Sequence, residues 1–209
     1  MHKLFLISVL ILSSMVSARS QDGWTKIKIE GFGSIDLPPN MEVQGGAYRE
    51  MSDKQKEING ISASKVIFQQ KNLNNGSQSS LNTYARVFIR TEIGTVGEYQ
   101  KLSNFSLNSS ELKEMNDELK TEFYNSAASS NAAILEWYPA TLSSLNGYKS
   151  ATLGYKRKLG TNPPVLAMIY FFHNSNRLHV LTFEYRIADE ITWQPTFEKI
   201  KKSLTINSQ

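Results

Sequence analysis

The sequence predicts an α+β domain, with helices packed on an antiparallel β-sheet. Segments with alternating or uniformly apolar residues have the length of strands and are grouped in the last third of the chain. Asn146-Gly147 is the strongest hairpin signal, because both central residues of the tight turn need positive φ. Apolar residues at helical spacing occur only in 112–123 and 193–204. Strands grouped in hairpins with few helices are typical of this fold class.

The first eighteen residues read as a secretory signal peptide. His2 and Lys3 are followed by a nine-residue run, 4–12, that is apolar apart from Ser8, and Val16-Ser17-Ala18 offers small residues for cleavage. The apolar run is too short to span a bilayer. We therefore expect a signal peptide at 1–18 and a single α+β domain at 19–209.

Predicted strands in the first half are separated by polar loops. In 24–30, Thr25, Ile27 and Ile29 form an apolar face, and extended structure resumes at 34–37 before Pro38-Pro39. Further strands are predicted at 61–71 and 84–93, and polar composition predicts loops at 45–60 and 72–80.

One helix is predicted at 111–123, with Asn108 at its start and Glu111 three residues later. This helix is expected to end without a sharp boundary in 126–133. Strands are expected at 148–159, 165–172 and 178–185. A closing helix is expected at 193–204, with Thr192 as its cap and Pro195 in its first turn.

The chain contains no cysteine and has a formal net charge of +4. Disulfides, thiolate zinc sites, iron–sulfur clusters and a cysteine nucleophile are therefore excluded. With the predicted signal peptide, this composition favours a bacterial envelope protein, periplasmic or secreted. No cofactor is predicted.

Two segments carry a family resemblance. Gly33-Ser34-Ile35-Asp36-Leu37-Pro38-Pro39 follows the opening strand, and Leu178-His179-Val180-Leu181-Thr182-Phe183 precedes the closing helix around Phe197 to Leu204. This order resembles the PsbP-like superfamily, which includes Mog-type Ran-binding proteins. The resemblance implies an α/β/α sandwich and accessory work on other proteins, and it assigns no functional residue to a position of this chain.

Catalytic and metal chemistry has little support in the sequence. His173 and His179 flank a tight turn, but no third ligand is evident, and zinc sites need three or four. Glu184 shares a strand face with Arg186, and we interpret it as an outer-face ion-pair residue because no second carboxylate lies at usable spacing. No Gly-x-Ser-x-Gly nucleophile motif or phosphate-binding loop occurs.

Trp137, Tyr138, Lys156 and Lys158 form the candidate binding surface. Trp137 and Tyr138 are expected just before the first C-terminal strand, where exposure would mark a binding surface and burial a core. Lys156 and Lys158 share one strand face, and we interpret them as lysines that protect a sheet edge. Export argues against nucleic acid as their partner.

These observations predict an exported, non-catalytic accessory or binding protein whose partner is another envelope or secreted protein. Loops 45–60 and 72–80 are its expected contact surfaces. One alternative is a carrier of a small apolar ligand, with a pocket lined by Met115, Leu119 and Phe123. Another is a hydrolase that uses Glu184 with His173 or His179.

Overall fold

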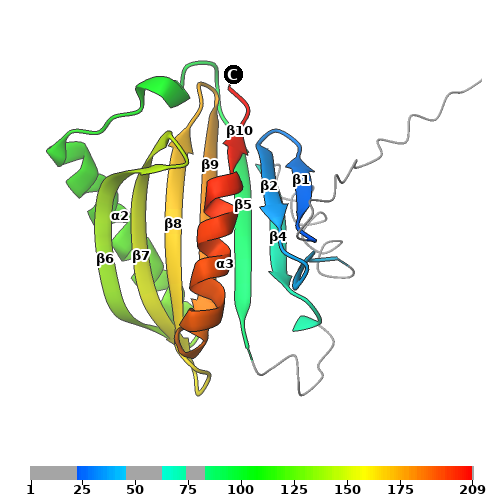
Figure 1. Ribbon diagram of the computed structural model, residues 1–209. Helices are drawn as coiled ribbons and strands as arrows, with labels where there is room; N and C mark the ends of the chain where they lie inside the picture. The colour runs from blue at the N-terminus through cyan, green and yellow to red at the C-terminus, as the bar shows by residue number, and fades with distance from the viewer. Residues whose placement is uncertain (1–22, 46–62, 74–82, 209) are drawn as a thin grey trace, which may run out of the picture.

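The computed structural model describes residues 23–45, 63–73 and 83–208. A seven-stranded antiparallel sheet has the order β3-β4-β5-β9-β8-β7-β6, and a three-stranded sheet has the order β1-β2-β10. The strands are β1 (Thr25–Ile29), β2 (Gly33–Leu37), β3 (Met41–Val43), β4 (Ala63–Gln70), β5 (Ala85–Ile93), β6 (Ala132–Leu145), β7 (Tyr148–Leu159), β8 (Val165–His173), β9 (Arg177–Arg186) and β10 (Thr205–Ile206). The long helices are α2 (Ser109–Ser129) and α3 (Glu190–Ser203). Figure 1 shows both sheets.

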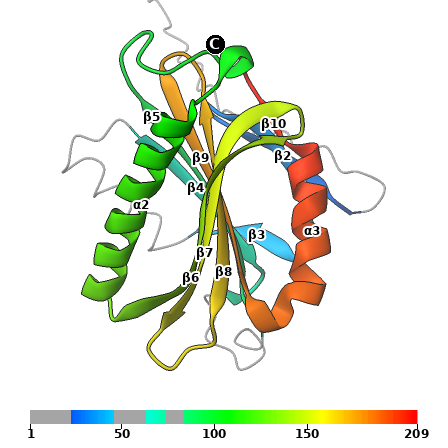
Figure 2. The same ribbon diagram turned by 90° about the vertical axis from the view of Figure 1, so that its left-hand side faces the viewer.

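The two helices lie on opposite faces of the large sheet, which gives an α/β/α sandwich and confirms the predicted fold class (Figure 2). Trp193, Phe197 and Ile200 of α3 pack into one core with buried side chains of β5, β8 and β9. The other face carries a second core, against which Met115 and Phe123 of α2 pack. Alternation along the strands therefore supplies apolar side chains to both layers.

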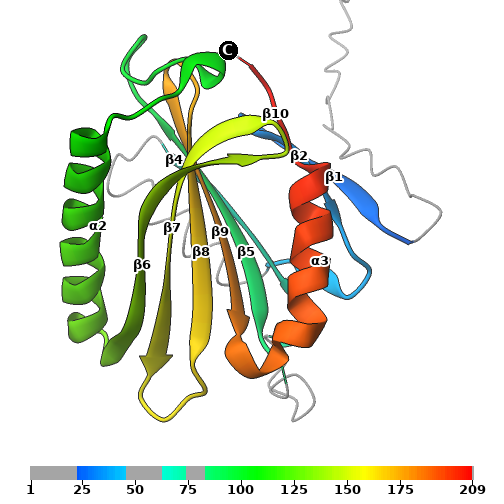
Figure 3. The ribbon, with the colours of Figure 1, turned by 60° about the vertical axis from the view of Figure 1, so that its left-hand side comes forward.

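The predicted strands agree closely with the observed ones. Val87 and Ile89 of β5 are buried on the α3 face, while Arg86, Phe88 and Arg90 alternate with them on the α2 face. Asn146 and Gly147, both at positive φ, form the β6–β7 turn. Figure 3 shows this hairpin curving over the sheet toward the end of α3, where Asn146 Nδ2 donates to the Leu204 carbonyl at 2.7 Å.

Helix α2 begins with a complete capping box. Asn108 Oδ1 accepts hydrogen bonds from the N–H groups of Ser110 and Glu111, and the Asn108 N–H donates to the Glu111 carboxylate at 2.7 Å. The start of the helix was therefore predicted correctly. Its end was not, because the helix continues through the small residues to Ser129.

We expect Asn108→Ala to lower the free energy of unfolding by about 1 kcal/mol, since it leaves two backbone N–H groups of the first turn without this acceptor. Urea denaturation measures the change. The control is Asn125→Ala at an exposed position of the same helix, where alanine's higher helix propensity should be neutral or slightly stabilising. Equal losses in both variants would contradict the role of the cap.

Helix α3 starts earlier than predicted. A 3₁₀ turn at Ile187–Asp189 leads directly into the helix at Glu190, so Thr192 is not its cap. Pro195 consequently lies in the second turn rather than the first and removes one main-chain hydrogen bond there. Asp189 and Glu190 place negative charge at the helix N-terminus, where it is favourable.

The sheet edge also differs from the prediction. Residues 137–139 lie inside β6 rather than before it, and β6 is the edge strand. Lys156 and Lys158 belong to β7, an interior strand of the sheet, so they do not protect its edge. Lys156 is paired with both β6 and β8, and Lys158 is paired with β6. Register shifts at Ile134/Glu136 and Tyr138/Thr141 interrupt the edge strand itself, a common device against edge-to-edge pairing.

Some predictions concern residues outside the described ranges. The signal peptide at 1–18 lies there entirely, as do most of the loops 45–60 and 72–80.

Strands β3 and β10 were not predicted. Across the described part of the chain, no helix is both long and apolar enough to cross a membrane.

Candidate functional site

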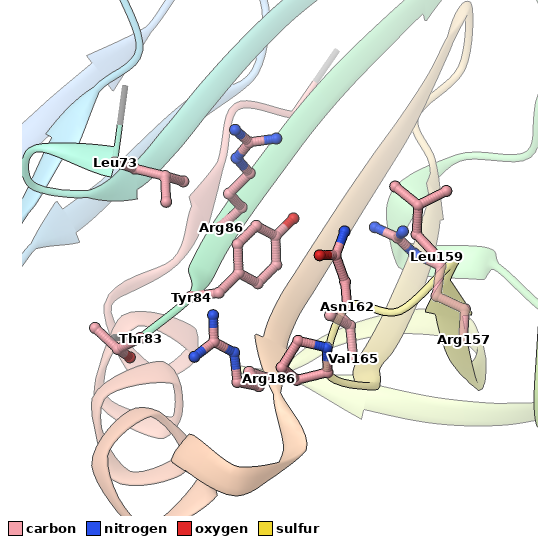
Figure 4. A pocket seen from close by; sticks show the side chains of 10 residues that line it. Leu73, Thr83, Tyr84, Arg86, Arg157, Leu159, Asn162, Val165 and Arg186 are labelled. Carbon is pink, nitrogen blue, oxygen red and sulfur yellow. The ribbon is translucent and has the colours of Figure 1, made fainter. Parts of the chain in front are cut away.

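A cavity of about 370 Å³ opens at the end of the large sheet where α3 begins. Arg86 of β5, Arg157 of β7 and Arg186 of β9 line it, together with Tyr84 and Asn162. We call this hollow the arginine cavity. Figure 4 shows the three arginines arranged around Tyr84 and Asn162. Because side chains alternate along a strand, the register of β5, β7, β8 and β9 places the three arginine side chains on the face of the sheet that α2 covers.

Glu184 holds two side chains of the arginine cavity in place. It is only 5 % exposed, and its Oε2 atom accepts hydrogen bonds from the Tyr84 hydroxyl at 2.9 Å and from Arg157 Nη2 at 3.0 Å. Burial and the Glu184 charge raise the pKa of Tyr84, so it is a neutral donor. Burial alone would lower the pKa of Arg157, but Glu184, Tyr84 and Tyr155 together outweigh it and the pKa rises. Both donors therefore persist at neutral pH.

Arg186 has an ion-pair partner in Asp189, whereas Arg86 has none among the described residues, although Glu184 lies opposite it on β9. Arg186 Nε lies 3.9 Å from Asp189 Oδ2, which also accepts the Tyr84 N–H at 3.0 Å. Arg86 lies over the Tyr84 ring, 5.5 Å from its centroid, and its buried Nε atom has no hydrogen-bond partner. Within the described ranges, no carboxylate forms an ion pair with Arg86. Three guanidinium groups thus face two carboxylates.

A second concave region lies between α2 and the same sheet face. It consists of two hollows of about 380 and 310 Å³ that share Leu119 and Phe171, and we call them together the α2 groove. The floor is apolar and includes Ile169, Phe171 and Val180. Met115, Leu119 and Phe123, the residues predicted to line a pocket, do line it.

Charges of opposite sign border the α2 groove. Helix α2 contributes Glu111, Glu114, Glu118 and Glu122, which are spaced three, four and four residues apart and so form one acidic rim. On the sheet side, β4 and β5 contribute Lys65 and Arg90. Glu184 also lines the groove, and its hydrogen bonds to Tyr84 and Arg157 place it next to the arginine cavity.

The structure separates Trp137 from the other three residues of the predicted binding surface. Trp137 lies on the α2 face, where its Nε1 donates to Asn116 Oδ1 at 2.9 Å and its ring stacks with Tyr155. Tyr138 and Lys156 lie on the opposite face, with Lys156 Nζ 5.7 Å from the Tyr138 ring centroid and 2.6 Å from Glu136 Oε2. Lys158 is exposed on that face as well.

The two histidines also lie on opposite faces of the sheet. His173 borders the α2 groove, where its ring contacts Phe105. His179 is fully buried on the α3 face and contacts Phe32. Among the residues that the structure describes, no cluster of His, Cys, Asp and Glu side chains could hold a metal ion.

The arginine cavity was not predicted from the sequence, in which Arg86, Arg157 and Arg186 belong to three separate strands. Pairing the strands would have brought Arg86, Arg157 and Arg186 to one end of one face.

No family model and no curated protein matches this sequence. The structure is similar to the solution structure of cyanobacterial PsbP from Synechocystis sp. PCC 6803, at 12 % identity and a TM-score of 0.48, over 98 % of this chain and 99 % of that one. It is also similar to a crystal structure of a protein from Bacteroides thetaiotaomicron, at 11 % identity and a TM-score of 0.45, over 88 % of this chain and 48 % of that one. The likeness to PsbP is one of fold.

Proposed function

We propose that this protein is an exported, non-catalytic binding protein whose arginine cavity holds the anionic group of its ligand. The observation that carries this proposal is a cavity of about 370 Å³ lined by three arginines, of which Arg86 forms no ion pair with any residue that the structure describes. The planar guanidinium group matches carboxylates and phosphates in geometry, and such hydrogen bonds are among the strongest in proteins. A negative group would complete the charge balance.

The contacts of Glu184 support binding rather than catalysis. The hydrolase alternative requires Glu184 to work with His173 or His179 as an acid or base. Glu184 Oε2 is instead engaged by Tyr84 and Arg157, and His179 lies on the other face of the sheet. We therefore assign Glu184 a positioning role, in which its hydrogen bonds hold Tyr84 and Arg157 in place, so that the remaining N–H groups of Arg157 are available to the ligand.

Calorimetric titration at low ionic strength, with inorganic phosphate and with hexanoate, tests the proposal. We expect both anions to bind the wild-type protein, while the neutral hexan-1-ol does not. Arg86→Ala should weaken anion binding about 10- to 100-fold, which corresponds to losing a charge-assisted hydrogen bond of about 1.5–3 kcal/mol.

The matched control is Arg90→Ala. Arg90 lies on the same strand and face but outside the arginine cavity, and it forms an ion pair with Glu92 at 2.9 Å. Because Arg90 is exposed, we expect only a few-fold change in affinity from this variant. Failure of both anions to bind, or equal affinities of Arg86→Ala and wild type, would overturn the proposal.

A further inference from the structure

The arginine cavity and the α2 groove lie end to end along β8 and β9. On β8, Val165 lines the cavity, Ile169 the middle of the groove and His173 its far end. On β9 the same order runs through Arg186, Glu184 and Leu178. The eight residue steps from Val165 to His173 correspond to about 26 Å of strand. The arginine cavity and the α2 groove therefore lie in line on one face of the sheet, with the hydrogen-bonded side chains of Tyr84, Arg157 and Glu184 where they meet.

We call the arginine cavity and the α2 groove together the elongated site; it is charged at one end and has apolar side chains along much of its floor. We propose that the ligand is a long-chain carboxylic acid, whose carboxylate binds in the arginine cavity and whose alkyl chain lies along the floor of the α2 groove. The inference rests on the proposed function of the arginine cavity as an anion site. It adds the chemistry of the remainder of the ligand.

Charge complementarity sets the orientation of the ligand. A carboxylate is attracted to the arginine cavity, where three guanidinium groups meet two carboxylates, and it is repelled by the acidic rim of α2. Lys65 and Arg90 border the middle of the groove, whereas Glu111, Glu114 and Glu118 border its far end. An alkyl chain is unaffected by that rim, and it covers apolar floor residues such as Phe171 and Val180. The rim glutamates stay exposed to water beside the bound chain.

Binding of linear carboxylates from hexanoate to hexadecanoate, kept below their micelle concentrations, tests this inference on the wild-type protein. We expect affinity to rise about fourfold for each methylene that enters the groove. Hexadecan-1-ol, with the same chain but no charge, should bind at least tenfold more weakly than hexadecanoate. These comparisons need no variant and so do not depend on whether a variant folds.

A variant tests whether the alkyl chain of the ligand lies in the α2 groove. Thr182, on β9 between Phe88 and Ile169, lines the groove and is half-buried. We expect Thr182→Phe to fill this space and to weaken hexadecanoate binding more than tenfold, while phosphate binding stays unchanged. Thr141→Phe is the control, since Thr141 is an exposed strand residue of β6 outside the groove.

The outcomes separate the two proposals. Equal affinities for hexanoate and hexadecanoate, with phosphate binding still sensitive to Arg86→Ala, would overturn the long-chain ligand and leave the anion site standing. Equal affinities for hexadecanoate and hexadecan-1-ol would overturn the carboxylate recognition on which the long-chain inference rests, while phosphate binding decides whether the anion site stands. Unchanged hexadecanoate binding in a folded Thr182→Phe protein would overturn the placement of the chain.

Discussion

Phe197→Ala should lower the free energy of unfolding by about 3–5 kcal/mol, a large part of the stability of a typical domain. Phe197 is 2 % exposed and is the central contact of α3 with the sheet. Its ring centroid lies 5.1 Å from that of Phe183 and 5.8 Å from that of Tyr185. Alanine would leave a cavity between two layers that cannot close over it without moving the helix.

Urea denaturation monitored by tryptophan fluorescence measures this loss, because Trp193 lies in the same core. The matched control is Ile191→Ala on the same helix, where the side chain is 92 % exposed. We expect the control to change stability by less than about 0.5 kcal/mol. Similar values for the two variants would mean that α3 contributes little to the fold.

Lowering the pH from about 6.5 to about 4 should destabilise the protein through His179. Burial, together with the charge of Arg177, lowers the pKa of His179 to about 4. Between that pH and 6.5 the unfolded chain binds a proton that the folded chain does not, so stability falls as the pH falls. The full loss through this residue is about 3 kcal/mol.

The hydrogen bonds of His179 explain why protonation is resisted. Asn174 Nδ2 donates to the Asn207 carbonyl at 2.8 Å and lies 3.2 Å from His179 Nε2, so Nε2 must accept. The proton then lies on Nδ1, which donates to Thr91 Oγ1 at 2.9 Å. A second proton on Nε2 would face the amide donor of Asn174 and break this arrangement.

His179→Gln isolates the effect, because glutamine offers a donor and an acceptor without titrating. We expect the stability of this variant, measured from pH 7 to pH 4, to fall less steeply than that of the wild type. Burial also lowers the pKa of His173. Because His173 is present in both proteins, its contribution cancels in the comparison. Parallel pH profiles would show that His179 is protonated without cost.

The regular part of the fold could be predicted because its signals are local. Alternation in 84–93, the Asn146-Gly147 turn and the apolar stripe of α2 each depend on neighbours in sequence. The start of α3 was misplaced because Thr192 resembles a cap, whereas the helix grows out of the 3₁₀ turn at Ile187–Asp189. Short strands such as β10 carry too few residues for a periodic signal.

The candidate site depends on pairings that the local pattern does not contain. Glu184 was expected to lie on the outer face beside Arg186, yet it is buried between Tyr84 and Arg157, residues 100 and 27 positions away. Lys156 and Lys158 were interpreted as edge residues because the strand order was unknown. Only strand order shows which charged side chains meet and which face they share.

The small sheet imposes an order of events on folding. Strand β2 pairs with β1 nearby but also with β10, and Ser34 is hydrogen-bonded to Thr205, 171 residues later. Closing so long a loop is entropically unfavourable until the intervening sheet and α3 have formed. One side of β2 therefore has no strand to pair with until β10 has been synthesised, whereas the β1–β2 hairpin needs only neighbouring residues. Residue 206 is thus the point in the chain at which the small sheet can be completed.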